Sequence, residues 1–164
     1  MINQFNQMPP NAKVWIYASD RSISPSQLAI INQKTVPFIQ NWTAHQNQLK
    51  AEFAVLFHCF LVFMVDEGVH EISGCGIDKL THLIREIDTE TNLNLFNRMG
   101  VQLLENNEVI GMTKAEFLSK MATHDLSNTK AFNNQVTNKT QFDLEWIIPT
   151  ENAWYYPKTK LQSL

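Results

Sequence analysis

The feature that most constrains the fold of this chain is an uninterrupted apolar run, CFLVFMV, at residues 59–65. Successive side chains of a strand point to opposite faces of a sheet, so a strand that is apolar throughout has to be covered on both faces. The run is far shorter than the roughly 20 apolar residues that a membrane-spanning helix needs. We therefore predict that these residues form a central strand that is buried on both sides.

The segments around this run predict further strands and two helices. Residues 13–19 are rich in β-forming side chains, and residues 49–57 alternate apolar with polar side chains. A tight antiparallel hairpin is expected at His58 and Cys59, where the two runs meet. One helix is expected to begin at Ser24 and Pro25, which suit a cap and a first helical residue, and a second to span about residues 76–91.

Residues 98–123 predict another hairpin and a third helix. Strands are expected at residues 98–105 and 108–112, joined at Asn106-Asn107, and Thr113 and Glu116 form a capping box for the helix. The first six elements follow the ferredoxin-like order β-α-β-β-α-β. We predict one α+β domain over residues 1–164, with an antiparallel sheet and helices on one face. Its core lies at about residues 13–124, and residues 125–164 form a less regular C-terminal extension with a short helix near 139–146.

Charge and cysteine content narrow the class of protein. The formal net charge is −3 and no cluster of Lys and Arg appears, which argues against a nucleic-acid partner. Two cysteines in a chain of 164 residues make no disulfide framework, and the first ten residues lack the regions of a signal peptide. These features favour a cytoplasmic protein with no membrane partner, and no motif requires a cofactor.

The peptide FLVFMVDE at residues 60–67 resembles a Walker B strand, which ends in an acidic pair that holds Mg²⁺. ATP hydrolysis also needs a phosphate loop, GxxxxGK[ST], and none of the five glycines has that spacing. We therefore expect a buried strand that ends in a polar loop, and no ATPase. A few acidic and imidazole side chains follow closely, but their spacing matches no metal template, so we predict no metal site. They are Asp66, Glu67, His70, Glu71 and Asp78.

The peptide SGCGIDK at residues 73–79 is the best candidate for a functional site. The first amides of a helix attract anions, which makes Ser73, Gly74, Gly76 and Lys79 candidate residues for binding a small anionic ligand. A thiol at the same place ionises more readily. At about 100° per residue, Cys75, Asp78 and His82 share one helical face, away from the apolar stripe. They are candidate catalytic residues, as a nucleophile with its base.

A purely structural explanation of this peptide is also open. Gly-Cys-Gly would only let the chain turn into the helix, Asp78 would complement the helix dipole, and His82 would be solvated. The catalytic hypothesis requires that Cys75 be accessible. Near the end of the chain, Trp154, Tyr155 and Tyr156 are expected to pack back on the domain, with an exposed partner surface as the alternative.

Five peptides together resemble one protein family. They are VWIY (14–17), FMVDE (63–67), SGCGIDK (73–79), LFNRM (95–99) and FNNQVTNK (132–139). The resemblance is to small uncharacterised bacterial proteins that often carry the automatic label "ABC transporter ATPase". It implies a compact cytoplasmic bacterial protein and brings no activity, cofactor or catalytic residue. The missing phosphate loop contradicts the label.

Two functions remain open at this level. One is a binding or interaction domain without ATPase activity, which could form a homodimer through an open sheet edge. The other is a thiol-dependent enzyme or a binder of a small anionic ligand that uses Cys75 at the helix N-terminus.

Overall fold

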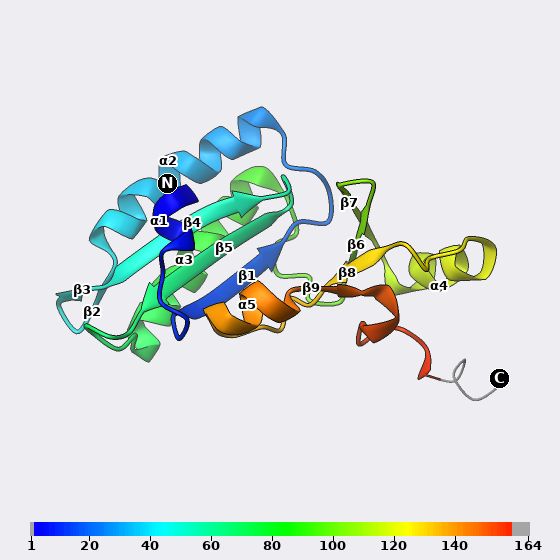
Figure 1. Cartoon of the computed structure of the whole chain (residues 1–164). Coiled ribbons are helices and arrows are strands. Elements are labelled where there is room, and N and C mark those ends of the chain that lie inside the picture. The colour runs from blue at the N-terminus through cyan, green and yellow to red at the C-terminus, as the bar shows by residue number, and fades with distance from the viewer. Residues whose placement is uncertain (1, 159–164) are drawn as a thin grey trace.

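In the computed structural model, which describes residues 2–158, three strands form an antiparallel sheet (Figure 1). They are β1 (Lys13–Ala18), β4 (Lys50–Leu56) and β5 (Phe60–Asp66), in the order β1-β5-β4. All residues of the central strand β5 are buried. The predicted doubly covered strand is therefore confirmed, as is the hairpin at residues 57–59, where Phe57 and His58 adopt positive φ.

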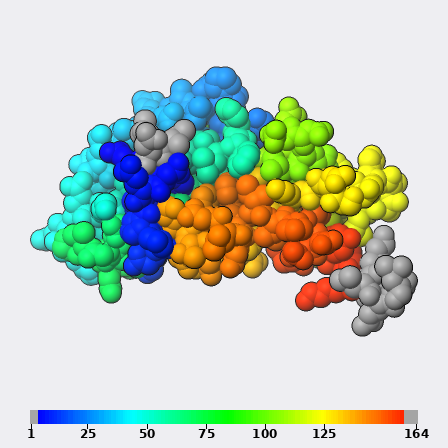
Figure 2. Space-filling model, viewed as in Figure 1, coloured from blue at the N-terminus to red at the C-terminus, as the bar shows by residue number. Residues whose placement is uncertain are grey.

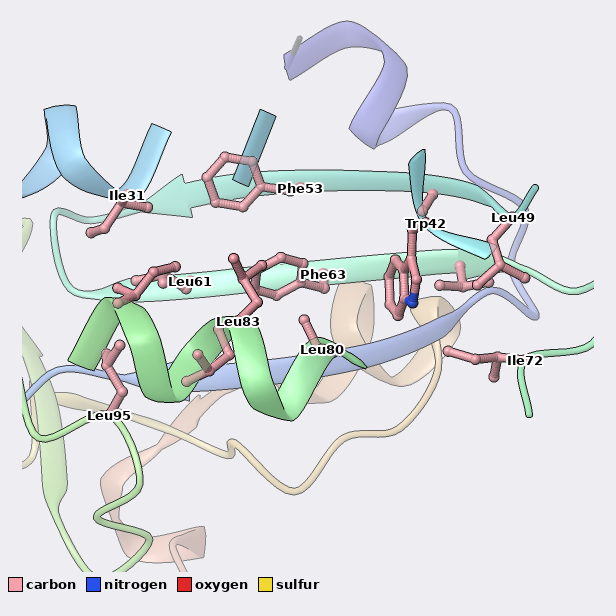
Figure 3. Close-up of a cluster of buried hydrophobic side chains, with 14 of the residues drawn as sticks. Ile31, Trp42, Leu49, Phe53, Leu61, Phe63, Ile72, Leu80, Leu83 and Leu95 are labelled. Atoms are coloured by element: carbon pink, nitrogen blue, oxygen red, sulfur yellow. The ribbon is translucent and has the colours of Figure 1, made fainter. Parts of the chain in front are cut away.

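Two long helices cover one face of this sheet. They are α2 (Pro25–Asn41) and α3 (Gly74–Thr91), which pack against the side chains of Leu61, Phe63 and Val65. Figure 3 shows Leu80 and Leu83 of α3 beside Leu61 and Phe63, in what we name the first cluster. This packing fixes the orientation of both helices, so their outward faces together form part of the molecular surface.

Both helix starts are explained by local hydrogen bonds. The Ser24 hydroxyl accepts from the amide of Gln27, and the Gln27 side chain accepts from the amide of Ser24, which is a complete capping box. Ser73 caps α3 by accepting from the amide of Gly76. Helix α3 therefore begins at Gly74, slightly earlier than predicted, and Cys75 lies in its first turn.

Segments from both ends of the chain cover the other face of the sheet. They include α1 (Ile2–Asn6), β8 (Lys130–Phe132) and α5 (Lys139–Glu145). Their side chains pack on Phe60, Val62 and Met64 in a second cluster that also contains Phe132 and Trp146. Figure 2 shows the N-terminal segment (blue) beside the segment that contains α5 (orange). Accordingly, the rings of Phe5 and Phe142 lie 6.0 Å apart.

Four strands from the second half of the chain form another sheet. It consists of β6 (Val101–Glu105), β7 (Glu108–Met112), β8 and β9 (Ile147–Pro149), in the order β7-β6-β8-β9 (Figure 1). Helix α4 (Lys114–Thr123) supports it through Phe117, which packs on Tyr155 in a third cluster. Tyr155 thus packs back on the protein as predicted, whereas Trp154 is 44% exposed.

The α+β class is confirmed, but the ferredoxin-like arrangement is not. That arrangement would place the strand after α3 beside β1, whereas β6 pairs with β7 and β8. Among the described residues, the outer edge of β1 therefore has no neighbouring strand and only one isolated bridge, between Lys13 and Asn138. A small hairpin of β2 (Thr43–Ala44) and β3 (Asn47–Gln48) and a 3₁₀ turn at Thr150–Asn152 complete the structure. None of the helices described is long and apolar enough to cross a membrane.

Candidate functional site

The structure places the three predicted catalytic residues in one groove. Cys75 is exposed, so the accessibility that the hypothesis requires is present. Together with Asp78 and His82, it lines a groove of about 720 Å³ between α2 and α3. The apolar side of the groove is formed by Phe38, Trp42 and Leu83. No residue of the described part of the C-terminal segment lines it.

The geometry within this groove does not pair the thiol of Cys75 with the imidazole of His82. The Nε2 atom of His82 lies 3.1 Å from a carboxylate oxygen of Glu86, one turn further along α3. Cys75 and His82 are two turns apart, which is about 10 Å along a helix that rises 1.5 Å per residue. A nucleophile and its base need hydrogen-bond contact, at about 3 Å. The three side chains thus share the lining of one groove, and Cys75 is not within hydrogen-bond reach of His82.

The four candidate ligand-binding residues mostly hold the start of α3 in place. The ammonium of Lys79 donates to the carbonyl and hydroxyl oxygens of Thr43, at 3.1 and 2.9 Å. The indole N–H of Trp42 donates to the carbonyl of Gly76, at 2.9 Å. A Cβ atom at Gly76 would lie 2.9 Å from the Ile72 side chain, so packing demands glycine there. Ser73 is the helix cap, and Gly74 alone faces open space.

The acidic pair at the end of β5 also has structural partners. Asp66 accepts from the ammonium of Lys50 at 2.9 Å and from the amide of Gly68, and these bonds lower the pKa of its carboxyl group. Glu67 pairs with Lys13 at 3.0 Å and accepts from the amide of Ile72. Both carboxylates hold the loop that leads into α3. Within residues 2–158, no three His, Cys, Asp or Glu side chains are grouped to hold a metal ion.

A larger cleft, which the sequence did not reveal, runs along the outer edge of β1. Its volume is about 830 Å³. Trp15, Ile16 and Tyr17 of β1 form its floor, and Phe96 and Arg98 line one wall. Phe132 and residues 134–138 form the opposite wall, and Trp154 also lines the cleft. We name this the β1 cleft; it exists because β6 joins the second sheet.

The backbone of β1 is only partly paired on the cleft side. The amide of Val14 donates to the carbonyl of Thr137 at 3.0 Å, and the amide of Lys139 donates to the carbonyl of Ala12. Among the described residues, those that precede Thr137 in this segment make no backbone hydrogen bond to β1. Because donors and acceptors alternate along a strand, the Val14 carbonyl and both backbone groups of Ile16 point into the cleft. None of the described residues hydrogen-bonds to these three groups.

The cleft combines aromatic surface with one unpaired cation. Tyr17 and Phe96 are in edge contact, with ring centres 5.9 Å apart, and Phe96 is 39% exposed. Burial raises the pKa of Tyr17, although the nearby charge of Arg98 opposes this shift. Lys13 is neutralised by Glu67 within the same cleft. Arg98 has no ion pair in the part of the chain that the structure describes, so the lining carries a net positive charge.

The sequence does not reveal this cleft because its walls come from segments that are far apart in the chain. A local signal nevertheless existed. Four of the five peptides on which the family resemblance rests, at residues 14–17, 63–67, 95–99 and 132–139, contribute residues to the lining of the cleft. In comparisons with known proteins, no protein-family model, curated protein or solved structure matches the chain.

Proposed function

We propose that this chain is a binding domain without ATPase activity, and that the β1 cleft is its binding site. The observation that carries this proposal is the unpaired backbone edge of β1 at the floor of a walled cleft. The volume of about 830 Å³ lies within the usual range of about 300–1,000 Å³ for ligand sites. Aromatic lining with a few convergent polar groups is typical of such sites.

We also propose that the protein is bacterial and cytoplasmic, and that it is related to the family whose peptides it resembles. It is supported by the five peptides and by the sparse cysteines. The lack of a phosphate loop in the sequence supports a function other than ATP hydrolysis.

A fragment screen by NMR tests the proposal. The isotopically labelled protein is mixed with a library of small fragments, and the indole signals of Trp15 and Trp154 report binding in the cleft. We expect fragments that shift these signals, and we expect the shifts to vanish when Gln135→Trp fills the cleft. The matched control, Gln33→Trp on the exposed side of α2, should leave binding unchanged. Fragments that bind only between α2 and α3, or nowhere, would contradict the proposal.

A second candidate function uses the groove between α2 and α3. It is a thiol-dependent enzyme or a binder of a small anion, and it is favoured by the accessible Cys75 beside Asp78 and His82. Measuring the rate of thiol alkylation across pH tests it. A Cys75 that reacts no faster than a model thiol at every pH would exclude an activated nucleophile, and titration with inorganic phosphate would test the anion site.

A further inference from the structure

From the β1 cleft we infer the chemical class of its ligand: one extended peptide segment that carries a carboxylate and adds to the edge of β1 as a further strand. This inference rests on the proposed function, because it names what the same cleft binds. Three features support it independently: the free backbone groups, the alternating lining of the cleft and the uncompensated charge of Arg98.

The free backbone groups of β1 set the length of the peptide that the cleft can hold. The carbonyl of Val14 and the amide and carbonyl of Ile16 are free on the cleft side, and a partner strand would satisfy all three. At about 3.3 Å per residue, the edge from Val14 to Ala18 is about 13 Å long. It therefore accepts a short stretch of extended chain, comparable in length with β1 itself.

The lining of the cleft suits the alternating side chains of a strand. Trp15 and Tyr17 point to the helix side of the sheet, where Phe96 continues the aromatic surface. Ile16 points to the other side, where Phe132 belongs to the same cluster. Successive side chains of an added strand would meet these two surfaces in turn. The cleft thus offers apolar contact on both faces of the peptide.

The charge of the cleft selects an acidic segment. Lys13 and Glu67 neutralise each other, so Arg98 supplies the net charge of the lining. A planar guanidinium binds a carboxylate through two parallel hydrogen bonds, which adds geometric selectivity. The protein as a whole carries a net charge of −3, so this positive cleft differs from the rest of its surface.

The walls of the cleft favour a single strand over the sheet of a second copy. At one end the edge of β1 is already paired with the segment around Thr137. At the other end the amide of Asp20 donates to the carbonyl of Leu93, which closes the edge there. A folded sheet edge would collide with both closures, whereas one extended segment fits between them.

Selection of peptides by phage display tests this inference. Random decapeptides are selected on the immobilised native protein, and peptides that also bind the filled-cleft variant Gln135→Trp are removed. We expect enriched sequences that contain an Asp or Glu at a fixed position. In a peptide bound as a strand, every second amide faces β1. N-methylation of these amides should weaken binding roughly tenfold for each lost hydrogen bond, whereas N-methylation of the intervening amides should leave binding unchanged.

Protein variants separate the backbone and charge contributions. Ile16→Pro removes the outward amide of an edge strand, where proline is tolerated, and Ile16→Val is its control. Arg98→Gln should weaken binding by up to about fivefold and remove the preference for acidic peptides, whereas Arg98→Lys should retain part of it. If Ile16→Pro fails to fold, the N-methylated peptides still test the backbone contact on the native protein.

Each contrary outcome overturns the inference in a recognisable way. If fragments bind the cleft but no peptide is enriched, the binding function stands and the peptide class is wrong. If neither binds, the proposed function fails as well. Peptides that tolerate N-methylation at every amide would exclude strand addition. A dimer in light scattering that Ile16→Pro dissociates would identify a second copy as the occupant.

Discussion

The two cysteines of the chain lie in opposite environments. Cys59 is buried at the end of the β4–β5 hairpin, where its thiol donates to the carbonyl of Ser19 at 3.3 Å. This burial raises its pKa to about 12. Cys75 is exposed in the first turn of α3. Because the thiolate is the reactive form, the folded protein should distinguish the two cysteines sharply.

We predict that an alkylating reagent modifies the native protein once, at Cys75. At pH 8, a thiol with a pKa of about 12 is almost entirely protonated, so Cys59 should react only after unfolding. Mass spectrometry of the native protein and of the Cys75→Ser variant measures this. Modification of Cys59 in the folded Cys75→Ser variant, at a rate like that of the denatured chain, would contradict the burial.

Asp66 should make stability depend on pH. Its hydrogen bonds to Lys50 and Gly68 lower its folded pKa below the ordinary value, so its contribution is present above pH 4 and lost at lower pH. We expect Asp66→Asn to lower the free energy of unfolding by about 1 kcal/mol at pH 7 and by much less near pH 2. Urea titrations at both pH values measure this difference. The exposed control Glu108→Gln should change little, and an equal loss at both pH values would exclude the ionic contribution.

At the scale of elements, patterns within the chain predicted most of the structure. Helix α2, helix α4 and the β6–β7 turn have strong local signals, namely two capping boxes and the Asn106-Asn107 pair in positive φ. The strands β8 and β9 were missed. They are only three residues long, and pairing with distant strands holds them in place. A strand of three residues is too short to show the alternation of apolar and polar residues that marks a strand in a sequence.

The difference between local patterns and pairing of distant segments also explains which candidate site could be predicted. Cys75, Asp78 and His82 share a groove because helical periodicity alone puts them on one face of α3. The β1 cleft depends on the strand pairing of β6, a choice made between segments far apart in the chain. The helix start at residues 73–79 could be predicted, whereas the lack of a partner strand beside β1 among the described residues could not.

The cap of α2 provides a test at this scale. The Ser24→Ala substitution should lower the free energy of unfolding by about 1 kcal/mol, because the amide of Gln27 loses its side-chain acceptor. Urea denaturation measures the loss, and Ser24→Asp, which restores an acceptor, should recover most of it. An equal loss for both variants would show that capping is not the cause.

At the scale of the whole molecule, the C-terminal part is an integral layer of the fold. Trp146 is buried in the second cluster, with its ring 5.1 Å from that of Phe60 on β5. Its indole N–H donates to the side-chain carbonyl of Asn134 at 3.0 Å. The face of β5 that carries Phe60, Val62 and Met64 therefore depends on residues that follow far later in the chain.

We expect Trp146→Ala to lower the free energy of unfolding by about 3–5 kcal/mol, as large truncations in a core do. Leu144 is 75% exposed only two positions away, so Leu144→Ala should change stability by less than about 0.5 kcal/mol. Chemical denaturation of both variants measures this contrast. Similar small effects would mean that the C-terminal layer contributes little to the core.

The double cover of β5 also has a consequence for biosynthesis. A ribosome delivers Phe60, Val62 and Met64 well before Phe132 and Trp146, which cover them. At about 5–20 residues per second, this face of the nascent sheet stays open to water for several seconds. An apolar sheet face exposed for that time is a target for chaperones and a hazard for aggregation. The yield of folded protein in cells should therefore be most sensitive to substitutions in the last layer to be made.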